Sequence, residues 1–104
     1  LSPDFSSLIR QPGRGIIVTA QSTKSNSDII SRYFAPWVGV NEDPVTGSAH
    51  CALAEFWAGK IDKPVLTAYQ ASSRGGYLDI ERAESGRVKL SGSAVIALKG
   101  TLFI

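Results

Sequence analysis

Apolar side chains in this 104-residue chain fall into short runs that polar segments separate. A β-branched run at 15–20 and a second run at 28–34 have the length and composition of strands. The polar segment 21–27 between them predicts a loop. Pro36 follows the second run and ends or bends it, because proline cannot donate to a strand ladder. The first third of the chain therefore predicts two strands, preceded by one short helical turn within residues 3–9.

The middle of the chain predicts a helix. Residues 47–58 are rich in alanine, Glu55 is the only charged residue among them, and Gly59 supplies a stop. A helix that is apolar nearly all round is typical of a buried helix. Its small side chains would let surrounding strands approach closely.

The last forty residues predict a meander of four strands, because turn signals interrupt a series of strand-length runs. The runs are 65–70, 77–82, 87–90 and 94–99. Two strands, one helix and a meander fit an α+β fold in which a curled, mainly antiparallel sheet wraps around one central buried helix. We expect residues 1–104 to form a single domain.

Composition narrows the classes of function. A content of 43% apolar and 19% charged residues is typical of a folded globular domain. The single cysteine excludes an internal disulfide and a cysteine-rich metal cage. A net charge of +2 with mixed signs is no footprint for nucleic acid, and no apolar run reaches the roughly 18 residues of a membrane span. We therefore expect a cytoplasmic protein without a metal, a nucleic-acid partner or a membrane segment.

The candidate chemistry lies just before the predicted helix. Glu42 and Asp43 are adjacent carboxylates, and Thr46, Gly47 and Ser48 place hydroxyl groups and bare backbone at the helix start. The first N–H groups of a helix lack partners and carry partial positive charge, so they can cradle a carboxylate or phosphate. Gly47 would let a ligand approach the backbone closely.

A structural alternative explains the same residues. Asp43 followed by Pro44 is also the pattern of an N-cap with proline at the first helical position, and Thr46 or Ser48 can equally serve as caps. The segment is no phosphate-binding Walker loop, because the Gly-Lys-Ser/Thr ending is absent, and Ser48 lacks the frame of a nucleophile elbow. The residues alone leave the anion site and the cap both open.

Four further features are weaker candidates for function. His50 lies one turn into the helix and can face a cleft, although a lone helix histidine is more often structural. Cys51 is most simply a small core residue. Arg74 with two glycines offers an anion a cation and a tight turn, or forms a structural turn only. The aromatic residues are more often core or domain-interface groups than stacking platforms; they are Trp37, Phe56 and Trp57.

The segment from Arg32 to Trp57, above all FAPWVGVNEDPVTGSAH at 34–50, closely resembles the signature of the PhzF-like phenazine biosynthesis family. Segments 15–20, 69–76 and 90–95 are also similar to that family, so the resemblance covers nearly the whole chain. It implies a diaminopimelate epimerase-like fold of two similar domains, each a curled sheet around a central helix. The chain looks like the C-terminal domain of such a protein, and the absence of methionine fits an origin in a longer chain.

The resemblance also implies a reaction. The isomerase that gives the family its name moves a proton within a dihydro-hydroxyanthranilate, without metal or organic cofactor. Its principal acid/base is a glutamate of the first domain, which has no counterpart here, since Glu42 matches the motif's own glutamate. Asp43 matches an aspartate of the same cleft, and Gly47 and Ser48 match its Gly-Ser pair. We expect Asp43 to be catalytic, and we expect a small carboxylate-bearing substrate to be bound by Thr46, Gly47, Ser48, His50 and Arg74.

These observations predict a domain of a cofactor-independent isomerase or epimerase-like enzyme that works by general acid/base proton transfer. Its active site would be completed by the N-terminal domain of the same protein, so the chain alone is expected to be inactive. The resemblance further suggests a homodimer. The alternative is a non-catalytic protein-binding module of the same fold, because a lone second domain would expose apolar surface that favours association.

Overall fold

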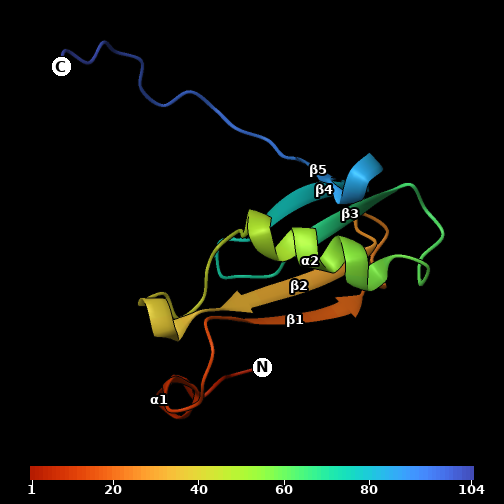
Figure 1. Cartoon of the computed structure of the whole chain (residues 1–104), viewed down its shortest axis with the longest axis horizontal. Helices are drawn as coiled ribbons and strands as arrows, with labels where there is room; N and C mark the ends of the chain where they lie inside the picture. Colours follow the sequence, from red (N-terminus) through yellow and green to blue (C-terminus); the bar gives the residue numbers. More distant parts are fainter.

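Five strands form one sheet, and the longer of two α-helices packs against one of its faces (Figure 1). The computed structural model describes residues 1–104. Its elements are α1 (Phe5–Ile9), β1 (Ile16–Gln21), β2 (Ile29–Phe34), α2 (Gly47–Trp57), β3 (Val65–Gln70), β4 (Gly76–Arg82) and β5 (Val88–Ser91). Short 3-10 turns lie at Pro36–Val38 and Glu84–Gly86.

The strands lie in the order β1-β2-β3-β4-β5, which is also their order in the sequence. β1 pairs with β2, β3 with β4 and β4 with β5 in antiparallel fashion, so the predicted mainly antiparallel sheet is confirmed. β2 and β3 are parallel, with Ile29 opposite Ala68. Parallel neighbours need a crossover connection, and α2 supplies it by crossing one face of the sheet. The result is a mixed sheet in an α+β fold.

The core lies between α2 and the sheet. Its buried members come from α2 and from the central strands; they are Ile29, Leu53, Ala54, Leu66, Ala68 and Ile80. Burial alternates along β3, because successive side chains of a strand point to opposite faces. Ala54 and Ala68 add little bulk, so the helix can approach the sheet closely. The core therefore fixes α2 above β2, β3 and β4.

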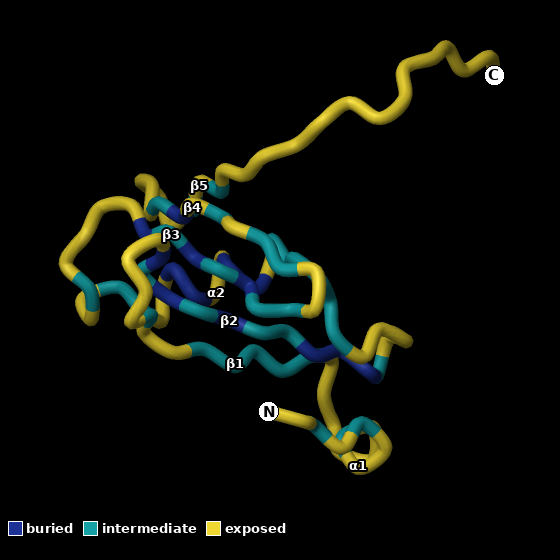
Figure 2. Tube along the Cα trace, turned by 180° about the vertical axis from the view of Figure 1, so that it is seen from behind, coloured by how far each residue is buried: buried dark blue, intermediate teal, exposed yellow.

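α2 is buried on one face only, which differs from the predicted burial all round. Ala49, His50, Leu53 and Ala54 face the sheet, whereas Cys51, Ala52, Glu55 and Phe56 are exposed (Figure 2). Residues one turn apart on a helix share a face, and in this chain no strand covers the outer one. Cys51 is thus no core residue, and Phe56 is 51% exposed. Trp57 is partly buried, and its Nε1–H donates to Thr19 Oγ1 at 3.0 Å.

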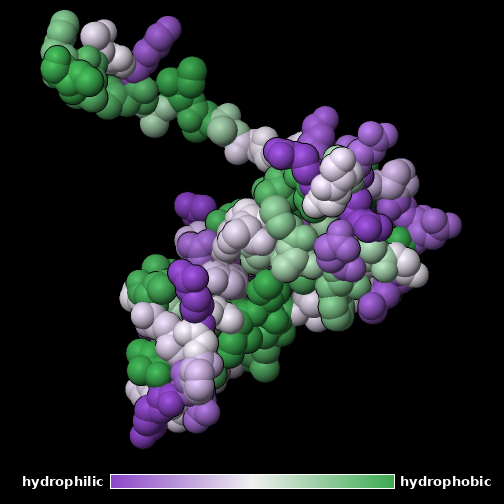
Figure 3. All heavy atoms as spheres, in the orientation of Figure 1, coloured by the Kyte–Doolittle hydropathy of each residue, from purple (hydrophilic) through white to green (hydrophobic).

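The segment after β5 leaves the sheet. Residues 92–104 contain no strand, so the predicted strand at 94–99 is wrong for this chain. A strand needs a neighbour for its N–H and C=O groups, and the tail runs away from every edge of the sheet (Figure 1). It carries large apolar side chains that are 84–92% exposed; they are Val95, Ile96, Leu98, Leu102 and Phe103. In Figure 3 this tail is a largely hydrophobic arm that stands apart from the body.

Candidate functional site

The segment between β2 and α2 brings the predicted site residues to one end of the sheet. Gly39 has a φ of 86°, which reverses the chain after the 3-10 turn at Pro36–Val38. An isolated bridge joins Ala35 to Val40. The N–H of Asp43 then donates to the carbonyl oxygen of Tyr33 at 3.0 Å. The loop 41–46 is therefore held against the end of β2 before α2 begins.

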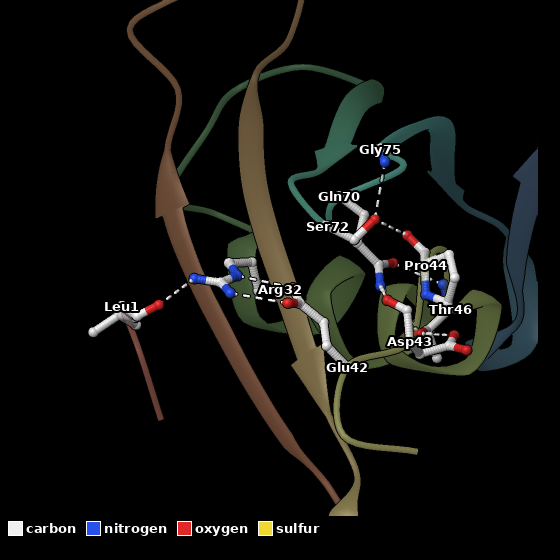
Figure 4. A network of polar contacts seen from close by, with 9 residues as sticks. All are labelled: Leu1, Arg32, Glu42, Asp43, Pro44, Thr46, Gln70, Ser72 and Gly75. Carbon is white, nitrogen blue, oxygen red and sulfur yellow. Dashed lines mark hydrogen bonds and ion pairs between the residues drawn. The ribbon is translucent and has the colours of Figure 1, made fainter. Parts of the chain in front are cut away.

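Glu42 is bound to Arg32 of β2. Arg32 Nε lies 2.8 Å from Glu42 Oε2, and Arg32 Nη2 lies 2.9 Å from Oε1, so the pair is bidentate (Figure 4). Arg32 Nη1 also donates to the carbonyl oxygen of Leu1 at 2.9 Å. The hydrogen bonds from Arg32 lower the pKa of Glu42, and partial burial opposes them only in part. Glu42 is therefore an ionised carboxylate that serves the loop's structure.

Asp43 has a different environment from Glu42. Its Oδ2 accepts a hydrogen bond from the hydroxyl of Thr46, and no other side-chain donor of the chain contacts the carboxylate. The side chain is half-buried. Helix α2 begins at Gly47, so the interpretation of Asp43 as its N-cap and Pro44 as its first residue is wrong. Asp43 therefore keeps acceptor capacity that the fold does not use.

The N-terminus of α2 has no side-chain cap. Thr46 occupies the N-cap position, but its hydroxyl turns to Asp43 instead of the amides that follow. The N–H groups of Gly47 and Ser48 have no acceptor within the chain. A Cβ added to Gly47 would meet only Leu90 Cδ1, at an ordinary 3.6 Å, so packing does not require this glycine. Two free amides thus lie one and two residues after Thr46, whose hydroxyl contacts the Asp43 carboxylate.

Gln70, at the end of β3, holds the loop between Asp43 and Thr46. Its Oε1 accepts from the N–H of Thr46 at 2.7 Å, and its Nε2 donates to the carbonyl oxygen of Asp43 at 2.8 Å and to Thr46 Oγ1 at 3.2 Å (Figure 4). The residue is only 1% exposed. The sequence interpretation missed it. A usable signal exists, since Gln70 takes the place of an apolar residue in the buried alternation of Leu66 and Ala68.

His50 supports the same loop from beneath. It is fully buried, with Nδ1 2.6 Å from the carbonyl oxygen of Thr46 and Nε2 3.1 Å from Ser31 Oγ. A carbonyl only accepts, so Nδ1 carries the proton and Nε2 of the neutral ring accepts from the Ser31 hydroxyl. Burial lowers the pKa of His50, against the opposing effect of the Thr46 bond. The ring therefore has no surface for the substrate contact predicted for it, and its role is structural.

The turn between β3 and β4 braces the loop from the other side. Ser72 Oγ donates to the carbonyl oxygen of Pro44 at 2.8 Å and accepts from the N–H of Gly75 at 2.9 Å. A Cβ on Gly76 would lie 2.3 Å from Val45 Cγ2, so this glycine is required by packing. Arg74 is exposed in this turn, and its guanidinium forms no hydrogen bond or ion pair within the chain. Its predicted contact with an anion stays a prediction.

The loop and the start of α2 contain two groups that the fold leaves without a strong partner, the Asp43 carboxylate and the first backbone amides of the helix. Glu42 is paired with Arg32, and His50 is buried, so Asp43 is the titratable side chain of the loop that is neither paired with a cation nor fully buried. No group of three or more His, Cys, Asp or Glu side chains is placed to hold a metal ion. No helix is both long and apolar enough to cross a lipid bilayer. The arrangement thus brings a carboxylate with unused acceptor capacity close to two backbone amides that have no acceptor in the chain.

The larger hollows of the chain lie elsewhere. One of about 520 Å³ lies at the C-terminal end of α2, between Trp57 and Arg82. Another of about 550 Å³ lies between β1 and the exposed face of α2, beside Phe56. Neither is lined by Asp43 or by any predicted substrate-binding residue. The chemistry of the loop, rather than the size of a cavity, identifies the candidate site.

Comparison with known proteins places the chain among related sequences and structures. Residues 1–100 match the model of the PhzC-PhzF family, phenazine biosynthesis-like proteins. An uncharacterised isomerase of Halalkalibacterium halodurans is 53% identical over the whole chain, which spans 39% of that relative. A human phenazine biosynthesis-like domain-containing protein is 46% identical over 86% of the chain and 32% of the relative.

A crystal structure shows the same similarity in three dimensions. A phenazine biosynthesis PhzC/PhzF protein from Clostridium difficile superposes with a TM-score of 0.84 and 43% identity, over 100% of this chain and 39% of that one. Both similarities extend over the whole of this chain, so the matched segment includes the loop with Asp43 and the Gly-Ser pair. The chain spans about two fifths of the length of the relatives it matches most fully.

Proposed function

The chain belongs to the phenazine biosynthesis-like (PhzC-PhzF) family, and on that premise we propose that it carries one half of the active site of an isomerase. Asp43 transfers a proton to or from carbon in this proposal, and the N-terminus of α2 binds a carboxylate of the substrate. The observation that carries it is the pairing of an accessible Asp43 with the two free amides of Gly47 and Ser48.

Asp43 suits a general acid/base because the neighbouring loop holds it without consuming it. The Thr46 hydroxyl fixes Oδ2, and the backbone of Asp43 is held at both its N–H and its carbonyl. A fixed carboxylate with free lone pairs can accept a proton from a bound substrate and return it to another carbon. Glu42, although adjacent, is bound to Arg32 and serves the loop instead.

The α2 terminus suits the binding of a carboxylate. The partial positive charge of a helix N-terminus favours an anion by about 0.3–1 kcal/mol, and two N–H groups can donate to its two oxygens. Gly47 contributes a bare backbone that a ligand can approach, and the exposed Ser48 hydroxyl can add a further hydrogen bond. An anion bound there would hold the substrate's reacting carbon near Asp43.

The remainder of the reaction belongs to protein outside this chain. The family resemblance implies a principal acid/base glutamate in a first domain, and this chain has no counterpart of that residue. Because the chain spans about 39% of its relatives, we propose that an N-terminal domain of the same protein supplies that group and closes the cleft. The reaction then needs no organic cofactor, and the two-domain chains form a homodimer.

The test measures deuterium incorporation by NMR in the full-length protein that contains this chain. A panel of small carboxylates, including dihydro-hydroxyanthranilate, is incubated in deuterium oxide with the wild type and with Asp43→Asn. We expect the substitution to slow incorporation by about 100-fold or more, because it removes the proton-transferring group. Asp62→Asn, on an exposed residue outside the loop, is the matched control. Equal rates for the wild type and Asp43→Asn would refute the role of Asp43.

A second candidate is a protein-binding module without catalysis. The exposed apolar tail 94–104 and the exposed Phe56 favour this function, because such surfaces promote association. The same measurement separates the two candidates. A full-length protein that exchanges no proton of any carboxylate, yet binds another protein through this surface, would be a binding module.

A further inference from the structure

We propose that Gln70 is a positioning residue that sets the distance between the Asp43 carboxylate and the free amides of α2. This inference deepens the proposed function and rests on it. It is carried by three hydrogen bonds from one buried side chain to the two ends of the loop segment 43–46.

The carboxamide of Gln70 replaces a turn hydrogen bond. In a β-turn, the carbonyl of the first residue accepts from the N–H of the fourth. Asp43 and Thr46 stand in these two places, but the Asp43 carbonyl binds Gln70 Nε2 at 2.8 Å, and the Thr46 N–H binds Gln70 Oε1 at 2.7 Å. The side chain is thus inserted between the two groups. It bridges the Asp43 carbonyl and the Thr46 N–H, so its removal would let the loop close or drift.

The insertion also decides which amides remain for a ligand. Thr46 precedes α2, and its N–H is taken by Gln70. The next donors, on Gly47 and Ser48, have no acceptor in the chain. Gln70 Nε2 also donates to the Thr46 hydroxyl, at 3.2 Å, which in turn donates to the Asp43 carboxylate. One residue of β3 therefore holds the Asp43 backbone and Thr46, which lie between the Asp43 carboxylate and the free amides.

Glutamine is the side chain that these contacts require. The Thr46 N–H needs an acceptor, and the Asp43 carbonyl needs a donor; a carboxamide offers both without a charge. A buried charge in its place would be costly and would perturb the neighbouring carboxylate. All buried polar side-chain atoms of the chain have hydrogen-bond partners, so the Gln70 amide is fully used. It is anchored in β3, between β2 and β4, which gives the loop a rigid support.

The neighbouring strand provides a second support for the same residue. Gln70 pairs with Ser31 across the parallel β2–β3 step, and Ser31 binds His50, whose other ring nitrogen binds the Thr46 carbonyl. The N–H of Thr46 is held from β3, and its carbonyl is held from β2 through His50. With His50 still in place, removal of Gln70 would release one side of Thr46 and leave α2 folded.

The test uses the full-length protein with Gln70→Met and Gln70→Glu. The first variant keeps the volume and removes both polar functions, whereas the second keeps an acceptor and loses the donor at neutral pH. Leu66→Ala is the matched control, since Leu66 is a buried residue of the same strand that packs in the core away from the loop. Three quantities are measured by NMR and denaturation: the hydrogen-exchange rate of the Thr46 amide, the affinity for benzoate at the Gly47 and Ser48 amides, and global stability.

We expect Gln70→Met to weaken benzoate binding by about tenfold or more, and to accelerate exchange of the Thr46 amide beyond the change in global stability. Leu66→Ala should lower stability and leave benzoate affinity within about twofold, because it acts on the core alone. Gln70→Glu should recover affinity as the pH is lowered, because its protonated carboxyl both donates and accepts.

Two different results would contradict the positioning role of Gln70 and the proposed carboxylate cradle, each independently of the other. Wild-type affinity for benzoate and wild-type exchange of the Thr46 amide in Gln70→Met would refute the positioning role. A wild-type protein that fails to bind benzoate at Gly47 and Ser48 would instead count against the carboxylate cradle of the proposed function. The exchange rate of the Thr46 amide would still decide whether Gln70 holds the loop.

Discussion

Arg32 and Glu42 join through two nearly equal hydrogen bonds, of 2.8 and 2.9 Å, that run from one planar guanidinium to both oxygens of one carboxylate. The adjacent Asp43 has no such cation. Two neighbouring carboxylates with the same chemistry are thereby separated into different roles. The guanidinium fixes Glu42 in its ionised form, and the Asp43 carboxylate has no cation partner within the chain.

Removal of this ion pair should lower stability measurably. Glu42→Gln is expected to cost about 1–2 kcal/mol of unfolding free energy, because both partners are three-quarters buried and Arg32 would lose its carboxylate. Urea denaturation of the full-length protein measures the change. Glu55→Gln is the control, since its bond to Arg82 is exposed and should contribute less than about 0.5 kcal/mol. Equal costs for the two substitutions would contradict the distinction.

Stability should fall below neutral pH because of His50. Burial lowers the folded-state pKa of this residue below its ordinary 6.5, so the unfolded chain binds its proton first. Stability is therefore complete above 6.5 and declines as the pH falls toward the folded-state pKa, with a slope of at most about 1.4 kcal/mol per pH unit. His50→Gln cannot take up that proton. Its unfolding free energy, measured by urea denaturation at a series of pH values below 6.5, should therefore fall less steeply with pH. An unchanged slope would remove His50 as its cause.

Gly47 and Gly76 should respond oppositely to alanine. A Cβ on Gly47 meets only an ordinary contact of 3.6 Å, so Gly47→Ala should raise stability by about 0.4–1 kcal/mol. Binding of benzoate should weaken at the same time, because the methyl group narrows access to the backbone. Gly76→Ala would place its Cβ 2.3 Å from Val45 Cγ2 and should cost about 1–3 kcal/mol. Loss of stability in Gly47→Ala would show that the glycine serves the fold.

The apolar tail should govern self-association of the isolated chain. Its large side chains are almost fully exposed, and such a segment with unpaired backbone promotes strand pairing between molecules. The chain shortened to residues 1–92 should therefore remain monomeric at concentrations where residues 1–104 associate, as measured by sedimentation velocity. Replacing Lys99 by Ala in the complete chain, which removes a charge from the same segment, should increase association. If residues 1–92 and residues 1–104 associate equally, the surface that drives association lies outside the tail.

Much of the fold could be predicted from local patterns. The β-branched run at 15–20, the Ala-rich segment at 47–58 and the meander from 65 to 90 all form the predicted elements within a few residues. The parallel pairing of β2 with β3 could not be predicted, because periodicity shows which face of a strand is buried and not which neighbour it takes. The tail 94–99 has a strand pattern that only a partner edge can satisfy.

The sequence indicated where the candidate site lies, but it gave less information on the hydrogen bonds that hold the loop 43–46 in place. The residue types marked Asp43 and the Gly-Ser pair as candidates, and the family resemblance, rather than the residues alone, assigned Asp43 a catalytic role. Whether Asp43 caps α2 depends on where the helix begins, and Gln70 of β3 holds the backbone of Asp43 and Thr46 outside the helix, ahead of Gly47. Such long-range hydrogen bonds have no local sequence signature, except that a polar residue interrupts an apolar alternation, as Gln70 does.

The lone thiol of Cys51 turns the outer face of α2 into a chemical reporter. It is the only cysteine of the chain, and it projects from the helix face that no strand covers. A thiol-specific reagent would modify the isolated chain at Cys51 alone, at the rate expected for a solvent-exposed thiol. In the full-length protein, the degree to which that reaction slows measures how completely the rest of the molecule shields the helix, without any knowledge of the substrate.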